Sequence, residues 1–230
     1  QRTTLRARRA TSLVHLFVVW GFVYYLLINL GDLIEGFFDV HFLGGGTIGG
    51  VYRFLGDILS VAVLAGVVYF LVRRFVAKAP ALAFHENVPL HERALPGMRR
   101  DSLIVGAFIL VHVGSRFLGR SFWIADRAGD PWQPAASLVA RLWDGLSFGT
   151  LETWSHLTWW LALGTILAFI PYFPYSKHIH LLMGPLNYFT RPDRRALGAL
   201  EPVDFEDESR EQFGAAKLEH LQQTHLFDAF

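Results

Sequence analysis

Four long apolar stretches, at about 11–30, 54–76, 102–124 and 151–173, constrain the fold of this chain more than any other feature. A helix that crosses the ~30 Å hydrocarbon core of a bilayer needs about 20 mostly apolar residues, and each stretch has that length. Amphipathic helices of soluble proteins carry a polar stripe, which these segments mostly lack. The sequence therefore predicts an all-α fold: an integral membrane four-helix bundle.

The composition supports this prediction and excludes several function classes. Only 18% of the 230 residues are charged, whereas 52% are hydrophobic. The net charge of +1 provides no long-range field for nucleic acid, so membrane lipid is the expected surrounding and nucleic acid is not an expected partner. Because the chain has no cysteine, it cannot hold thiolate-bound iron–sulfur clusters, and any metal needs histidine or oxygen ligands.

The basic residues predict the orientation of the bundle. Of the 21 lysines and arginines, fourteen lie at the N-terminus, in the region from Arg73 to Arg100, or between the fourth stretch and Arg195. Five lie in or beside the other two connections, and two lie in the C-terminal tail. The positive-inside rule therefore places both termini in the cytoplasm. We expect a membrane domain over 1–195, with an interfacial helix near 135–146, and a cytoplasmic linker helix within 196–230.

Five of the ten histidines lie within the predicted spans or at their ends: His15, His112, His156, His178 and His180. An ionisable side chain inside the bilayer needs a partner, and haem iron is one that a neutral imidazole can bind. His15 and either His178 or His180 belong near the inner face, where they could hold one b-type haem. His112 and His156 are candidates for a second, outer haem. The alternative is that these histidines reach headgroups or hydrogen-bond neighbouring helices.

Arg116 follows His112 by one helical turn and shares its face of the predicted helix. A guanidinium there could pair with the anionic propionates of a haem. It could equally extend to the lipid headgroups of the outer leaflet.

The stretch from Phe169 to Pro192, FIPYFPYSKHIHLLMGPLNYFTRP, resembles the exit of the last span in the nitrate reductase gamma subunit and in the membrane cytochrome b subunits of heterodisulfide-reductase-like complexes. Pro174, Tyr175, Ser176, Lys177 and His180 match this motif most closely. The segment HLFVVWGF, from His15 to Phe22, is similar to the first histidine motif of the same family. The resemblance implies that His15 and His180 are the iron ligands of one haem b.

Two positions depart from the family pattern. Relatives carry a haem histidine eighteen residues before the exit histidine, where this chain has Ala162. The nitrate reductase branch carries another histidine at the position of Tyr25. The outer haem is therefore either absent or held by His112 and His156 instead, and one haem is expected rather than two.

The resemblance also implies a function: electron exchange between membrane quinone and cytoplasmic iron–sulfur centres, in the cell membrane of a bacterium or the corresponding membrane of an archaeon. Lys177, Asp32 and Glu35 are candidates for proton exchange with quinone, or else solvated charges at the membrane boundary. Fused relatives continue from a step like Asp228–Phe230 into a cysteine-rich ferredoxin domain, so the iron–sulfur clusters are expected outside this stretch. The start at Gln1 suggests a fragment.

One alternative from a different class is a haem-free anchor, or structural subunit, of a redox or photosynthetic complex. The replacement of expected ligands at positions 25 and 162 favours it. A small-solute transporter would show inverted repeats or helices broken at mid-membrane, and the sequence shows neither.

Overall fold

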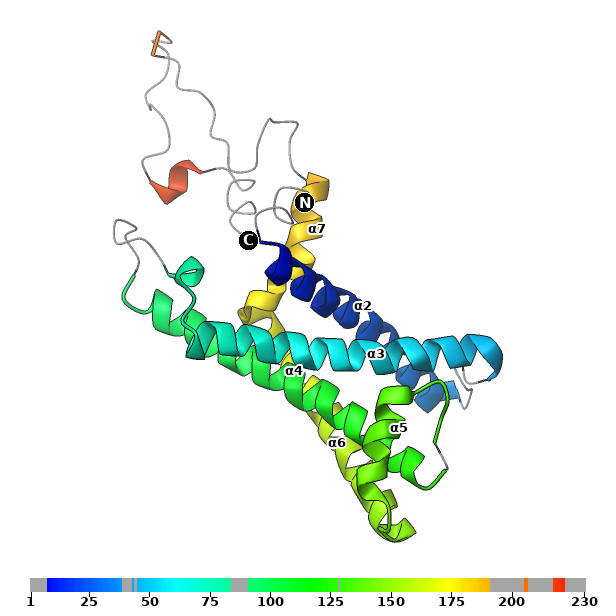
Figure 1. The fold of residues 1–230 in the computed structure, drawn as a ribbon. Helices are drawn as coiled ribbons and strands as arrows, with labels where there is room; N and C mark the ends of the chain where they lie inside the picture. Colours follow the sequence, from blue (N-terminus) through cyan, green and yellow to red (C-terminus); the bar gives the residue numbers. More distant parts are fainter. Residues whose placement is uncertain are drawn as a thin grey trace. The chain divides into compact units, whose positions relative to one another are not determined.

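A computed structural model describes residues 8–38, 43, 45–83, 91–127, 129–190, 205–206 and 217–221. These residues form helices, turns and loops, with no strand among them. Four helices are long and apolar enough to cross a membrane, which confirms the predicted all-α membrane bundle (Figure 1). They are α2 (Arg9–Phe38), α3 (Gly46–Leu71), α4 (Ala94–Ala125) and α6 (Phe148–Tyr172).

Shorter elements extend or connect the four long helices. A π-helical turn, η1 (Val72–Val76), continues α3, and a 3-10 turn, η4 (Phe173–Tyr175), continues α6. The remaining elements are η2 (Pro80–Leu82), α5 (Pro134–Ala140), η3 (Arg141–Trp143), η5 (Lys177–Ile179), α7 (His180–Thr190) and η6 (Leu218–His220). Most of the predicted linker helix within 196–230, including Asp228–Phe230, lies outside the described residues.

The chain divides into two compact units, Gln1–Phe169 and Ile170–Phe230. In the first unit, α2 and α3 run antiparallel. Tyr25 meets Ser60, and Gly21 lies against Val63, so residue numbers rise on one helix as they fall on the other. Leu71 packs at Gly106 and Leu64 at Gly114, so α3 and α4 are antiparallel as well.

Helix α4 pairs in turn with α6. Phe108 contacts Phe169, with 5.1 Å between the ring centroids, whereas Phe122 stacks on Trp154 at the other end of the pair, with 6.1 Å between centroids. The four long helices therefore alternate in direction along the chain. Large apolar side chains such as Trp20 and Trp160 lie on exposed faces, which is the arrangement expected of helices surrounded by lipid.

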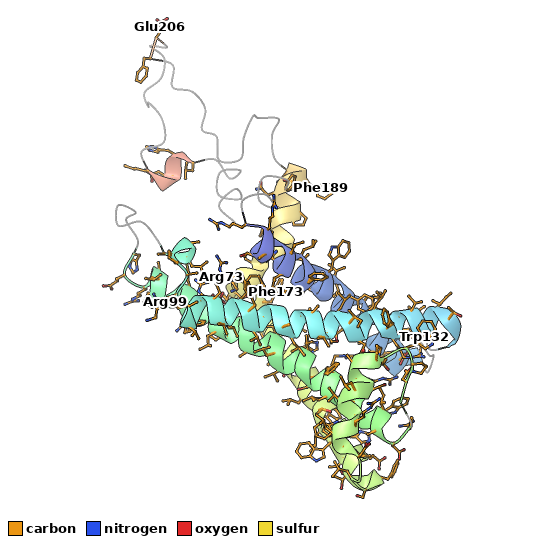
Figure 2. The ribbon with its side chains drawn as sticks, viewed as in Figure 1. Arg73, Arg99, Trp132, Phe173, Phe189 and Glu206 are labelled. Carbon is orange, nitrogen blue, oxygen red and sulfur yellow. The ribbon has the colours of Figure 1, made fainter. Side chains whose placement is uncertain are left out.

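Helix α5 lies against α3 and α4 at one end of the bundle, called here the α5 end (Figure 1). Ala136 and Ala140 pack on Ile124 of α4 in a small buried cluster. Trp132 sits against Gly50, where a Cβ atom would come within 2.3 Å of the indole (Figure 2). Arg73 and Arg99 lie at the opposite end of α3 and α4 (Figure 2). A helix is thus present in the region expected near 135–146, as α5 followed by η3, and its position at the membrane interface stays a prediction.

Candidate functional site

His112 lies on the face of α4 that meets Tyr25 of α2 and Ala162 of α6. Its residue is 9% exposed, and its Nδ1 lies 3.0 Å from the carbonyl oxygen of Ala162. Because a carbonyl can only accept, Nδ1 carries the proton and Nε2 keeps a lone pair. Nε2 is buried and has no hydrogen-bond partner in the described part of the chain.

Tyr25 packs edge-on against the His112 ring, with 5.7 Å between ring centroids. Its hydroxyl lies 2.6 Å from Ser60 Oγ, and Ser60 donates its own proton to the carbonyl of Gly56 at 2.5 Å. Tyr25 is therefore the donor to Ser60, since a hydroxyl has one proton to give. The proton of Tyr25 is committed to α3 and does not serve His112.

Arg116, one turn beyond His112, forms an ion pair with Asp32 of α2. The same guanidinium nitrogen lies 3.5 Å from the side-chain oxygen of Asn29. Asp32 is the more exposed partner, with 40% of its side chain accessible against 23% for Arg116. The structure thus gives Arg116 a carboxylate partner from the protein, and its role in binding a haem propionate stays a prediction.

His156 is exposed on α6, about six residues before Ala162. Six residues correspond to roughly 9 Å along a helix and a rotation of about 240°. The structure therefore does not bring His156 to His112. Since Nε2 of His112 is covered by protein atoms, the residues here do not fit a porphyrin held by this pair.

His15 is exposed near the beginning of α2. Its ring lies edge-on to Phe70 of α3, with 6.2 Å between ring centroids. An exposed imidazole on an apolar helix face is a position from which iron could be bound. His15 belongs to the first unit and His180 to the second, and their pairing stays a prediction.

In the second unit, Ser176 organises the exit of α6. It is 3% exposed, its hydroxyl donates to the carbonyl of Phe173 at 2.9 Å, and it accepts the backbone N–H of His178 at 3.1 Å. This cap begins η5, which leads directly into α7 at His180. The Pro–Tyr–Ser–Lys part of the predicted exit motif therefore forms a defined turn ahead of His180.

His180 is exposed, and its Nδ1 is hydrogen-bonded to the carbonyl of Lys177. As at His112, the carbonyl fixes the proton on Nδ1 and leaves the lone pair on Nε2. Metal-bound histidines commonly have their second nitrogen tied to a carbonyl in this way, which fixes the ring orientation. His180 thus fits the role of a haem ligand. The half-buried His178 has its ring centroid 6.2 Å from that of His180, and Lys177 is exposed.

A polar cluster at the α5 end was missed by the sequence reasoning. Asp57 of α3 is 3% exposed and accepts the backbone N–H groups of Ala135 and Ala136, at 2.7 and 2.9 Å. Asp130 pairs with Arg53 at 3.0 Å, and Arg120 donates to Gln133 at 2.5 Å. Asp57 itself could have indicated this cluster in the sequence, because a carboxylate within a predicted membrane span needs a partner.

Among known proteins, the chain is similar to the probable iron-sulfur-binding oxidoreductase FadF of Bacillus subtilis (strain 168), with 27% identity over 231 residues. The match covers the whole of this chain but only 31% of FadF. No family model and no solved structure matches the chain. The resemblance to the nitrate reductase gamma subunit therefore rests on the sequence motifs alone.

Proposed function

We propose that this chain is the membrane electron-transfer part of an iron–sulfur oxidoreductase. Two findings support the proposal: four helices suited to crossing a membrane, and a relative named as an iron-sulfur-binding oxidoreductase, of which the chain matches about a third. The chain has no cysteine, so thiolate-held clusters belong outside it, in a further domain or a partner protein.

We further propose that the chain holds one b-type haem through His180, with His15 as the second ligand expected from the family resemblance. The observation that carries this proposal is the hydrogen bond from Nδ1 of His180 to the Lys177 carbonyl, which leaves Nε2 available to iron. The haem would supply single-electron transfer through protein of low dielectric constant. The protein's part is to orient the imidazole and to set the surroundings of the iron.

Quinone is the proposed electron partner in the lipid phase. Lys177 is exposed at the exit of α6 and adjoins the proposed haem ligand in sequence, so it is the first candidate for proton exchange with quinone. Asp32 is ion-paired with Arg116, and Glu35 is exposed near the end of α2. These two remain candidates for a separate site within the first unit.

The absorbance spectrum of the purified chain tests the haem. A b-type band in the reduced-minus-oxidised difference spectrum is expected, and adding an oxidised quinone should reoxidise the reduced protein. A flat spectrum from folded protein isolated from haem-replete cells would instead support the haem-free anchor and would overturn the cytochrome proposal.

Three single substitutions identify the ligand. His180→Ala is expected to abolish the band, whereas His178→Ala should retain it. His91→Ala is the matched control, because His91 lies in an exposed loop, where its Nδ1 accepts the backbone N–H of Arg93 at 3.1 Å. If His178→Ala loses the band and His180→Ala retains it, the ligand is His178 and the assignment to His180 is wrong.

A further inference from the structure

The half of the bundle between His112 and the α5 end is closed by direct contacts among its four long helices. Tyr25 of α2 bonds to Ser60 of α3 and packs on the His112 ring of α4. His112 in turn bonds to the backbone of α6 at Ala162. Each contact joins a different pair of helices, so side chains and backbone fill the centre of the bundle at this level.

Helices α4 and α6 are also in close contact further toward the α5 end, at Gly119. A Cβ atom placed there would lie 2.6 Å from Oγ1 and 3.4 Å from Cβ of Thr158. Ser155 also donates to the Gly119 carbonyl at 3.4 Å. Only a residue without a side chain permits this approach, which leaves no gap for a planar ring between the two helices.

The two positions at which the family pattern places additional haem histidines are Tyr25 and Ala162, and both contact His112. The imidazole of His112 thus occupies the space between Tyr25 and Ala162, where the two ligands of a second haem iron would meet. Its Nε2 is covered by protein atoms, so its lone pair is accessible to a small donor such as one buried water but not to iron in a macrocycle.

We propose that the α5 half of this bundle is a closed polar core that holds no second haem, with His112 as a packing residue in place of the cofactor. This inference rests on the proposed function, because it limits the chain to one haem. It leaves the electron-carrying role to the single haem proposed at His180.

Haem content provides the first test. The haem-to-protein ratio, measured from the pyridine haemochrome and quantitative amino-acid analysis, is expected to be one in the unchanged chain. The ratio should stay at one in His112→Gln and in His156→Ala. A ratio of two in the unchanged chain, or a fall in folded His112→Gln, would overturn the inference. A ratio of zero would overturn the proposed function instead, and the cross-link below then decides whether the core is closed.

A cross-link tests the closed core without using haem. Because the chain has no cysteine, the double variant Gly119→Cys with Thr158→Cys introduces its only two thiols. The Cβ separation of 3.4 Å at this pair lies close to the ~3.5–4.5 Å found in disulfides. Mild oxidation in lipid nanodiscs should therefore remove both free thiols, as counted with a maleimide reagent.

The matched control is Thr158→Cys with Gly164→Cys, which leaves Gly119 unchanged, and a Cβ atom at Gly164 meets nothing within 4 Å. The two positions are six residues apart on α6, roughly 9 Å along the helix, which is too far for a disulfide. This pair should keep both thiols under the same oxidation. If the Gly119–Thr158 pair keeps its thiols in protein that remains monodisperse, α4 and α6 are apart and the closed core is wrong.

Discussion

At the scale of single residues, Asp57 illustrates how one carboxylate fixes an element that is distant in sequence. It is almost completely buried and accepts two backbone N–H groups at the beginning of α5. A proline at the first position of α5 removes one N–H that would otherwise need a partner. The short helix is therefore attached to α3 by the side chain of one residue as well as by its apolar contacts.

Replacing Asp57 with Ala should destabilise the bundle. Each buried donor left without an acceptor costs roughly 1–3 kcal/mol, and Asp57→Ala leaves two. For a chain of this size, each kcal/mol lowers the unfolding midpoint by about 2–4 °C, which thermal unfolding in detergent can measure. Asp57→Asn keeps one acceptor oxygen, so its unfolding midpoint should fall less than that of Asp57→Ala. The control is Asp126→Asn, because Asp126 is an exposed carboxylate just after the end of α4. This substitution should leave the unfolding midpoint unchanged. If it lowers the midpoint as much as Asp57→Ala, this account of Asp57 is wrong.

The sequence predicted which residues bear charge at membrane depth but not their partners. Arg116 was expected to face a propionate or headgroups, and it pairs with Asp32, which lies 84 residues away in the chain. Asp57 and α5 are separated by 78 and 79 residues. Local patterns report burial and helical periodicity, whereas contacts over such separations depend on how the helices pack.

At the scale of whole elements, the four apolar stretches correctly identified the long helices but underestimated their length. The stretch at 11–30 became Arg9–Phe38, and that at 102–124 became Ala94–Ala125. The reason is that apolar composition marks only the part of a helix that lies in hydrocarbon. Helical hydrogen bonding continues into the interface until the chain reaches residues that end it.

Helix pairing in this bundle depends on glycines at contact positions, and Gly21 of α2 provides the sharpest test. A Cβ atom at Gly21 would lie 2.1 Å from Cγ2 of Val63, so Gly21→Ala must displace the Val63 side chain or separate α2 from α3. Overpacking of this kind costs roughly 1–3 kcal/mol. We expect a lower unfolding midpoint for the variant in detergent.

Gly36, on the same helix, provides the control for Gly21. A Cβ atom there meets nothing within 4 Å, so Gly36→Ala should gain helix propensity and leave stability equal or slightly higher. Equal destabilisation by the two substitutions would mean that the effect comes from the backbone of α2 and not from its contact with α3.

At the scale of the whole molecule, the length and apolar composition of four stretches predicted the membrane bundle, because the thickness and apolarity of a bilayer set both for any helix that crosses it. The candidate site was only partly predictable. The motif at Ser176 to His180 forms a local turn that sequence could suggest, whereas the closed core around His112 arises from contacts among four helices. A local sequence pattern does not report contacts between helices that are distant in the chain.

The distribution of basic residues predicts the orientation of the bundle in the membrane. Because the chain has no cysteine, single introduced cysteines can be labelled to measure that orientation. Fourteen of the 21 lysines and arginines lie on the side that includes Glu92, and five lie on the side that includes Asp144. Basic segments stay in the cytoplasm because they translocate poorly. In intact cells, a membrane-impermeant maleimide should label Asp144→Cys and not Glu92→Cys, although both positions are exposed. Permeabilised cells should label both. If only Glu92→Cys is labelled in intact cells, the orientation of the bundle is the reverse of the predicted one. The turn that carries His180 would then lie on the outer side.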